Sequence, residues 1–492
     1  MQDIHGQPGD KTTQSSQEDN KENPTDALIR MASEANLFLD QHHEPYASIE
    51  SNGSKVVHKV GGKSFKQWLF MRYFEEKRTV PSAEAIRQTL QLLEAQAHLK
   101  NQVHPLFLRV AEADGVIYYD LSDAEWQHVQ ITQHGYQVTR EHPLLFQRTT
   151  LTKTQVTPQN GGKLSNILNH LRFKNDLDGL LFMIYLVTCF IPNISHPALI
   201  LSGEKGAAKT TSARMIRSIV DPSHQDIAFM PKGTTNLALS LSRQFMLSLD
   251  NLDTLRPETS DLLCMAVTGG SISKRKLFTD DDETVLSFKG CLTLNGIGVV
   301  ANRPYFLDRS ILLELDRIDE HDRKEEAEIW RSFEADKPLI LGAIFELISK
   351  AMVTYPEVHL PALSRMADFT RWGYAIAQAA NVDGDLFLQA YEKNRSRINE
   401  EVMSSNPVAT AICFLMEEQS LWVGSVSKLL DVLEQIALSK KINTRSRLWP
   451  RAANVLSIRL QQIRSNLEEY GIYYDIRNKG FAKVIEIENR ES

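Results

Sequence analysis

Cysteine is scarce in this chain, and Cys189, Cys264, Cys291 and Cys413 lie far apart, each within an apolar stretch. The absence of a C-x-x-C pair or a Cys/His cluster argues against a zinc site and against a disulfide framework. Long hydrophobic runs are missing too, because the longest, residues 180–192, is shorter than the roughly 20 residues that span a bilayer. The N-terminus opens on polar residues and has no secretory pattern. We therefore expect a cytoplasmic protein with reduced thiols and no membrane partner.

A strong excess of one charge sign is also lacking. The chain has 55 Lys and Arg residues against 62 Asp and Glu residues, for a net charge of −7. A mildly acidic chain does not coat nucleic acid along its whole length, so any DNA contact must come from local basic patches. The length of 492 residues is enough for about three domains, each with its own core.

Pattern and composition divide the chain into five segments. Residues 1–25 are polar and predict a disordered tail. Residues 26–155 predict an α+β domain with two helices, a β-hairpin and two further short strands, which we interpret as a collar or as a docking site for a primase. Residues 156–355 alternate short buried strands with helices, as in a parallel α/β sheet. Residues 356–405 predict a helical linker or lid, and residues 406–492 predict helices that end in a strand pair.

A glycine-rich loop connects a buried strand at 198–202 to an amphipathic helix at 212–220. The loop is expected to form a cradle in which main-chain N–H groups and a helix N-terminus bind a triphosphate. The residues expected to bind the nucleotide are Gly203, Glu204, Lys205, Gly206, Ala207, Ala208, Lys209, Thr210 and Thr211. Lys209 is expected to reach the β- and γ-phosphates of ATP, and the Thr210 hydroxyl to bind Mg²⁺. Ala208 replaces the usual glycine of G-x-x-x-x-G-K-[ST], which is tolerable if its φ stays negative. A loop that only resembles a phosphate loop is the alternative.

A second buried strand, residues 245–249, ends in Asp250. We expect Asp250 to hold Mg²⁺ through water, because hard cations prefer oxygen ligands. The next residue, Asn251, can orient a water but cannot take its proton, and Asp253 is the nearest carboxylate that could. The identity of the catalytic base therefore stays open.

Two more polar residues lie next to buried strands. Asn295 ends the strand 292–295, where it would hydrogen-bond the γ-phosphate or the attacking water. Arg309 precedes the strand 311–315 and is a candidate arginine finger for a neighbour's γ-phosphate. Each residue taken singly is more often structural, but their order and compact spacing favour an ATPase.

Residues 165–350 resemble the AAA+ helicase module of phage, plasmid and genomic-island replication proteins. This module is close to the superfamily 3 helicases and more distantly similar to the minichromosome-maintenance helicases. The resemblance covers about two-fifths of the chain and rests on six short stretches, 203–211, 249–253, 266–270, 277–283, 294–297 and 307–311.

The resemblance implies a homo-oligomeric ring, usually a hexamer, in which a neighbour's arginine completes each ATP site. It also implies that a hairpin between Asp250 and Asn295 projects into the channel, which would bring Lys274, Arg275 and Lys276 close to single-stranded DNA. The alternative for these three residues is an exposed strand edge beside an acidic turn. Many relatives carry a fused primase, but this sequence has neither a primase-type carboxylate pair nor a zinc motif. Priming is therefore expected from a separate primase or polymerase.

The segment 440–464 has seven basic residues and no acidic one. Pro450 fits the first turn of a helix there, two helices precede the segment, and the strand pair follows it. Helices followed by a β-wing are typical of a winged-helix domain, whose last helix enters the major groove. The residues expected to contact DNA are Arg445, Arg447, Arg451, Arg459 and Lys479. A charged helix that covers the ATPase ring or a partner is the alternative.

These features predict an α/β protein with a P-loop AAA+ parallel-sheet core, an N-terminal α+β domain and a C-terminal winged-helix-like domain. The predicted function is that of an ATP- and Mg²⁺-dependent, ring-forming DNA helicase or replication initiator of a mobile element, which translocates on single-stranded DNA. One alternative is a nucleotide-dependent switch (a loader, regulator or defence ATPase), since Ala208 and Asn251 are both compatible with slow hydrolysis. Another is a metabolic P-loop kinase, against which the hairpin and the basic C-terminal segment argue.

Overall fold

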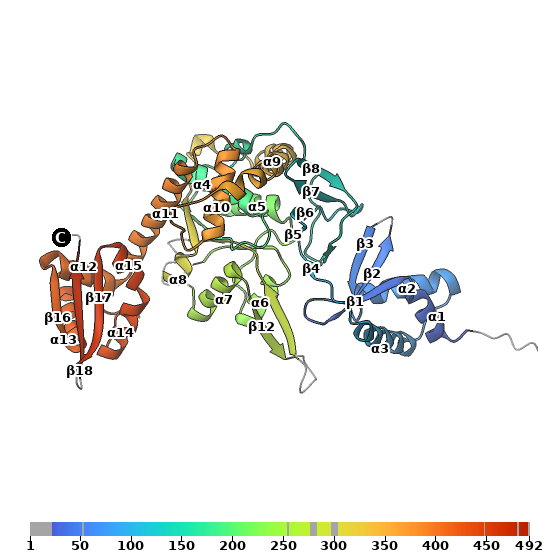
Figure 1. Cartoon of the computed structure of the whole chain (residues 1–492), viewed down its shortest axis with the longest axis horizontal. Helices are drawn as coiled ribbons and strands as arrows, with labels where there is room; N and C mark the ends of the chain where they lie inside the picture. Colours follow the sequence, from blue (N-terminus) through green and yellow to red (C-terminus); the bar gives the residue numbers. More distant parts are fainter. Residues whose placement is uncertain are drawn as a thin grey trace, which may run out of the picture. The chain divides into compact units, whose positions relative to one another are not determined.

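The computed structural model describes most of the chain, namely residues 22–51, 54–252, 255–275, 283–296, 304–446, 448–479 and 482–490. The chain divides into two compact units, residues 1–105 and 106–492 (Figure 1). Several sequence predictions fall outside the described residues: the tail up to residue 21, Asp253, Lys276 and Arg447. The side chains of Arg275 and Lys479 lie outside the described part as well.

The first unit is an antiparallel three-stranded sheet with three helices. Its elements are α1 (Pro24–Ala32), β1 (Ala35–Leu39), β2 (Pro45–Ser51), β3 (Ser54–Lys59), α2 (Lys63–Lys77) and α3 (Ala83–Lys100), with the strand order β1-β2-β3. Helix α3 begins where Ser82 accepts a hydrogen bond from the N–H of Ala85, and it ends at Asn101 in the left-handed region. Both helices α2 and α3 were expected from apolar spacing, and the structure confirms them.

The second unit begins with a small all-β part. It contains β4 (Leu106–Phe107) paired with β9 (Leu145–Phe146), and an antiparallel sheet of β5 (Val110–Ala113), β6 (Val116–Asp120), β7 (His128–Thr132) and β8 (Gly135–Thr139). This part is joined to the following segment by buried bonds. Arg109 forms an ion pair with Asp221 at 2.9 Å, and the Tyr119 hydroxyl donates to the carbonyl of Val220 at 3.1 Å. The domain boundary predicted at residue 155 therefore falls inside the second unit, because these long-range bonds have no signature in local pattern.

A four-stranded parallel sheet forms the centre of the second unit. Its strands are β10 (Ala198–Ser202), β11 (Met246–Leu249), β14 (Cys291–Asn295) and β15 (Ser310–Glu314), in the order β11-β14-β10-β15. The strands read as nearly continuous apolar runs because both faces of a parallel sheet are covered. The mixed α/β class with a parallel sheet is thus confirmed.

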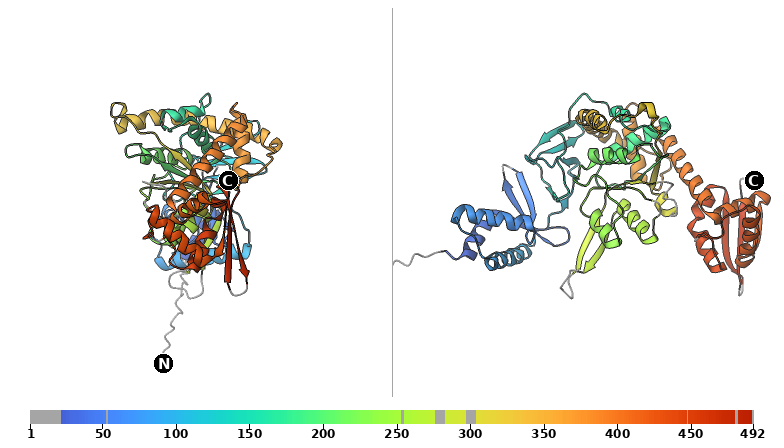
Figure 2. Two further views of the ribbon diagram at one scale, coloured as in Figure 1. Left: turned by 90° about the vertical axis from the view of Figure 1, so that its left-hand side faces the viewer. Right: turned by 180° about the vertical axis from the view of Figure 1, so that it is seen from behind.

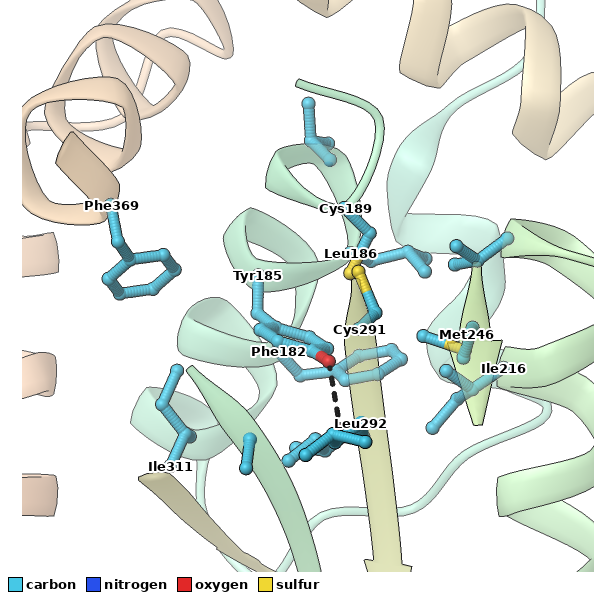
Figure 3. Close-up of a cluster of buried hydrophobic side chains, with 14 of the residues drawn as sticks. Phe182, Tyr185, Leu186, Cys189, Ile216, Met246, Cys291, Leu292, Ile311 and Phe369 are labelled. Carbon is cyan, nitrogen blue, oxygen red and sulfur yellow. Dashed lines mark hydrogen bonds between the residues drawn. The ribbon is translucent and has the colours of Figure 1, made fainter. Parts of the chain in front are cut away.

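Helices cover this sheet. They include α4 (Asp176–Thr188), α5 (Lys209–Val220), α6 (Thr234–Leu241), α7 (Pro257–Thr268), α8 (Pro304–Leu307) and α9 (Glu326–Thr354). Helix α5 contacts β10, β11 and β14, and α4 contacts β15. Figure 3 shows part of the resulting core, in which Phe182 and Tyr185 of α4 meet Leu292 of β14 and Ile216 of α5. All four cysteines are free thiols.

The span Glu326–Glu357, which is α9 with the short 3₁₀ turn after it, is long and apolar enough to cross a membrane. Half of its most apolar window is buried inside the protein. Phe333, Ile340, Ile344 and Phe345 of α9 belong to the same core as the parallel sheet. This burial is what a core helix requires.

Between β11 and β14 the chain forms the expected hairpin, β12 (Gly270–Arg275) with β13 (Glu283–Phe288). The hairpin lies beside α6 and α7 (Figure 1). Lys274 is exposed and pairs with Thr284, and Arg275 lies opposite Glu283. Its tip lies outside the described residues.

Two further helices, α10 (Ala367–Ala379) and α11 (Gly384–Ser405), follow α9. Helix α11 covers the open edge of β15, where Asn394 accepts from the N–H of Leu312 and donates to its carbonyl oxygen. Arg397 of α11 also forms an ion pair with Asp178 at 2.9 Å. An edge strand whose polar groups are occupied in this way is protected from pairing with another chain.

The C-terminal part has its own hydrophobic core. Its elements are α12 (Pro407–Glu418), β16 (Leu421–Ser425), α13 (Val426–Ser439), α14 (Ala453–Gln462), α15 (Arg464–Glu469), β17 (Ile472–Lys479) and β18 (Ala482–Asn489). The three strands form an antiparallel sheet in the order β16-β18-β17. Figure 2 shows β17 and β18 as a long strand pair beside the helices.

The two predicted helices before the basic segment and the strand pair after it are confirmed, but two details differ. Strand β16 was not expected, because five residues between two helices give too short an alternation to recognise. The expectation that Pro450 lies in the first turn of a helix is wrong, since α14 begins only at Ala453. The winged-helix interpretation of this part stays a prediction.

Candidate functional site

The glycine-rich loop runs from the end of β10 to the start of α5, as the sequence predicts. Gly203 has φ 141° and Gly206 has φ 94°, both in the region that favours glycine. A Cβ atom on Gly203 would lie 2.7 Å from the carbonyl oxygen of Leu315. The loop therefore requires glycine at 203 for both conformation and space.

Ala208 does not meet the condition set for it from the sequence, because its φ is +52°. A left-handed conformation costs an L-residue about 1–2 kcal/mol. Ala208 is thus a strained residue at the N-cap of the helix whose first residue is Lys209. Strain of this kind is found at functional sites, where the surrounding structure enforces it.

We expect Ala208→Gly to stabilise the protein by up to about 1 kcal/mol, because glycine relieves the left-handed strain. The urea midpoint of unfolding measures the change. Ala207→Gly is the matched control, since Ala207 is not among the residues with positive φ. An Ala208→Gly variant that unfolds more readily than the wild type would contradict the strain.

Lys209 lies inside the curve of the loop. Its ammonium donates hydrogen bonds to the carbonyl oxygens of Gly203 and Glu204, at 2.8 and 2.9 Å. These bonds hold a positive charge between the loop and the first turn of α5. A cation in this place is suited to the phosphates of a nucleotide.

Thr210, Asp250 and Asn295 meet next to Lys209. The Thr210 hydroxyl donates to Asp250 Oδ2 at 3.1 Å, and Asn295 Nδ2 donates to Asp250 Oδ1 at 2.5 Å and to Thr210 Oγ1 at 3.2 Å. The strand order explains the contact, because β14 lies between β10 and β11 and places Asn295 between the other two residues. The structure thus brings together four of the predicted site residues.

The donor set fits a small divalent cation. Thr210 and Asp250 offer a hydroxyl and a carboxylate, the hard oxygen ligands that Mg²⁺ prefers. Among the residues that the structure describes, no group of three His, Cys, Asp or Glu side chains could form an all-protein metal site. Mg²⁺ at this place would therefore depend on water and phosphate oxygens for its remaining ligands.

Asn251 is attached to this group through its main chain. Its N–H donates to Asp250 Oδ1 at 2.9 Å, its φ is 56°, and its side chain is exposed. The left-handed conformation is one that asparagine tolerates better than most residues. The identity of the catalytic base stays open, since Asp253, the nearest carboxylate in the sequence, lies outside the described residues.

Arg309 lies at the amino ends of the parallel strands, whereas the glycine-rich loop lies at their carboxyl ends. Its carbonyl accepts from the N–H of Ala198, the first residue of β10, and its guanidinium donates to the carbonyl of Tyr305 at 2.7 Å. A strand of five residues separates this end from the loop at the other end of β10, a distance of about 13 Å. Arg309 therefore does not belong to the site of its own chain, and its role toward a second chain stays a prediction.

The residues expected to contact DNA are spread over two places. Lys274 is exposed on β12, and Arg445 and Arg451 are exposed before α14. Arg459 is partly buried and donates to Gln462 Oε1 at 2.9 Å. The contacts of all these residues with DNA stay predictions.

A buried charge cluster at the C-terminal end of α5, the end away from the loop, was not predicted from the sequence. Asp221 follows the last residue of α5 and pairs with Arg109 at 2.9 Å and with Arg217 at 3.1 Å. It also accepts hydrogen bonds from the N–H groups of Phe245 and Met246, where β11 begins. Burial by itself raises the pKa of Asp221, but the two guanidinium groups and the N–H donors outweigh it and lower the pKa. No local motif signals this cluster, because its members are up to 137 positions apart.

The fold and site define a mixed α/β protein with a parallel sheet, and two family comparisons give a more specific class. Residues 164–401 match the family of the actinomycete integrative conjugative element replication protein. Residues 408–492 match the C-terminal domain of the RepA protein of these elements. The predicted link to replication of a mobile genetic element is thereby confirmed. No curated protein matches the chain.

Solved structures that are similar over most of the chain include Cch and the C-terminal region of NrS-1. The helicase Cch of SCCmec type IV, described as active, has 11% sequence identity and a TM-score of 0.47, with 93% of each chain covered. The C-terminal region of NrS-1 has 12% identity and a TM-score of 0.39, with 95% of this chain and 100% of that chain covered. Scores below 0.5 do not establish a common fold.

Proposed function

We propose that this chain is an ATPase that drives DNA translocation or unwinding during replication of a mobile element. The observation that carries the proposal is the contact of Thr210, Asp250 and Asn295 beside Lys209. A lysine, a hydroxyl, a carboxylate and an amide at the end of a glycine-rich loop are the groups that nucleotide hydrolysis needs. The family matches support the link to replication.

Each residue has a defined task in this proposal. Lys209 leaves the two carbonyl groups and neutralises the β- and γ-phosphates of ATP. Thr210 and Asp250 would hold Mg²⁺, which would supply positive charge to polarise the phosphates. Asn295, which is 3% exposed, orients the γ-phosphate or the attacking water from a fixed position.

The position of Arg309 supports an assembly of several copies. An arginine at the amino ends of the strands cannot contact a nucleotide at Lys209 of its own chain, but it could contact a nucleotide bound to a neighbouring chain. A homo-oligomeric ring, a hexamer by the resemblance described above, would supply such a neighbour. The exposed Lys274 on the β12–β13 hairpin would then contact single-stranded DNA in the channel.

We expect Arg309→Ala to retain nucleotide binding and to lose ATP hydrolysis by at least about a thousandfold, the range of an arginine finger. Turnover and the affinity for a fluorescent ATP analogue measure the two effects. Arg371→Ala is the matched control, because the Arg371 guanidinium packs on the ring of Tyr355 at 4.5 Å. Hydrolysis by Arg309→Ala at the wild-type rate would remove this residue from the site.

The experiment that tests the proposed function is ATP hydrolysis with and without single-stranded DNA, followed by unwinding of a forked duplex. DNA-stimulated hydrolysis together with unwinding is the expected result. ATP binding with negligible turnover in both conditions would contradict it.

That second outcome would favour a nucleotide-dependent switch that acts as a loader, regulator or defence ATPase. The observation in its favour is Asn251, which follows Asp250 directly and cannot accept a proton from the attacking water. A nucleotide that is bound but hydrolysed slowly can still order loops.

A further inference from the structure

Helix α14 has two chemically distinct sides. Leu456 and Leu460 are fully buried in the core of the C-terminal part. Asn454, Ile458 and Gln461 are exposed, and Ile458 has 54% of its surface accessible. Residues spaced by four and then three positions lie on one face of an α-helix, so these three form a single stripe opposite the buried leucines.

The stripe has the dimensions and the setting of a DNA-reading surface. From Asn454 to Gln461 the helix rises by seven steps, or about 10 Å, which corresponds to about three base pairs of duplex DNA. Exposed Lys441, Arg445 and Arg451 precede the helix, and the whole segment 440–464 lacks acidic residues. Ala452, just before α14, has no side chain that could cap the helix, and in the first turn the N–H of Val455 donates to Asn454 Oδ1 at 2.9 Å. Asn454 releases this bond when its amide reads a base.

The chemistry of the three side chains selects the base pair. The amides of asparagine and glutamine can each donate an N–H to adenine N7 and accept from the adenine N6 amino group, the two-bond pattern that fits adenine. An exposed aliphatic side chain contacts the methyl group of thymine. The face carries no carboxylate for cytosine, and none of its three members is a cation suited to guanine.

Single-stranded nucleic acid is a poorer ligand for this face. Sequence-tolerant binding of single strands depends on aromatic side chains on which bases stack, and α14 contains no aromatic residue. A straight helix with polar and aliphatic side chains on one face fits the major groove of a duplex instead.

We propose that α14 binds the major groove of duplex DNA and prefers A·T base pairs, with Asn454 and Gln461 reading adenine and Ile458 reading the thymine methyl group. The proposal rests on the proposed DNA function of the chain and adds to it a duplex ligand and a base preference. Lys441, Arg445 and Arg451 contribute phosphate contacts that do not depend on sequence.

The test uses the full chain and closed dumbbell duplexes, which have no single-stranded ends, with either an A·T-rich or a G·C-rich centre. Fluorescence anisotropy at fixed salt is expected to give at least about tenfold tighter binding to the A·T-rich duplex, the value of one good base contact. Equal affinities for the two duplexes would overturn the proposal.

Base analogues assign the preference to individual side chains. Replacing thymine by uracil removes only the methyl group, and it should weaken the wild type while leaving Ile458→Ala unchanged. Replacing adenine by 7-deazaadenine removes the N7 acceptor, and it should weaken the wild type while having little effect on the doubly substituted Asn454→Ala, Gln461→Ala variant. Variants that respond to the analogues as the wild type does would reject these contacts.

Leu438→Ala is the matched control, because Leu438 is 79% exposed on α13 of the same domain and lies outside the stripe. It should keep the full A·T preference. An Arg451→Ala variant should bind both duplexes more weakly by a similar factor and reduce the salt dependence by about one phosphate contact.

The failure of this inference can be told apart from failure of the proposed function. A chain that hydrolyses ATP in response to single-stranded DNA but binds both duplexes equally disproves only the role of α14. A chain without DNA-stimulated hydrolysis that still prefers the A·T-rich duplex disproves only the motor.

Discussion

The Lys209→Ala variant is expected to lose ATP hydrolysis by about a hundredfold or more, the effect of removing one preorganised charge donor from a phosphoryl-transfer site. Its ammonium makes two hydrogen bonds, both to loop carbonyl groups. These carbonyl groups lie on a partly exposed loop where water can replace the lost donor. The fold should therefore survive, and the temperature of unfolding should stay close to that of the wild type.

The loop contains its own control for this experiment. Lys205 is exposed and lies four positions before Lys209, so Lys205→Ala removes the same charge from the same loop. That variant should keep most of the wild-type turnover, because the charge of the exposed Lys205 side chain is screened by solvent. Full hydrolysis by Lys209→Ala, or an equal loss in both variants, would contradict the assignment of the ATP site to Lys209.

The part of the site that could be predicted from the sequence is the part that depends on strand ends. Asp250 and Asn295 each follow a buried strand, and the carboxyl ends of parallel strands meet at one edge of a sheet. The contact between them at Thr210 follows from that rule once β14 is placed between β10 and β11. The strand order itself is a long-range property and was not available from the sequence.

Other features could not be predicted because their causes are not local. A hairpin and two further short strands were expected where β5 to β8 lie, but the attachment of these strands to the unit of the parallel sheet depends on Arg109 and Asp221, which lie 112 positions apart. The left-handed conformation of Ala208 also contradicts what alanine prefers, since the flanking strand and helix impose it. In both cases tertiary contacts outweigh the local preference.

Asp221→Asn is expected to destabilise the second unit by about 3–5 kcal/mol, the cost of breaking a buried ion pair by removing one partner. The amide oxygen can still accept from the N–H groups of Phe245 and Met246. Arg109 and Arg217, each 1% exposed, are left without their carboxylate. Arg109 keeps hydrogen bonds to Ser122 and to main-chain carbonyl groups, and Arg217 keeps one to Gln244. The free energy of two buried guanidinium charges that have lost their counter-charge therefore determines the result, rather than any loss of packing.

The midpoint of urea unfolding of the second unit measures this loss, and its pH dependence tests the cause. The folded pKa of Asp221 is lower than its ordinary value, so the stability that this carboxylate contributes is present above about pH 4 and is lost as the pH falls through the folded pKa. The wild type should accordingly approach the variant in stability on acidification. Glu125→Gln is the control, because the pair of Glu125 with Arg140 is exposed and contributes less than about 1 kcal/mol. A difference between wild type and Asp221→Asn that persists unchanged into acid would show that shape, and not charge, makes Asp221 necessary at the junction of α5, β11 and the all-β part.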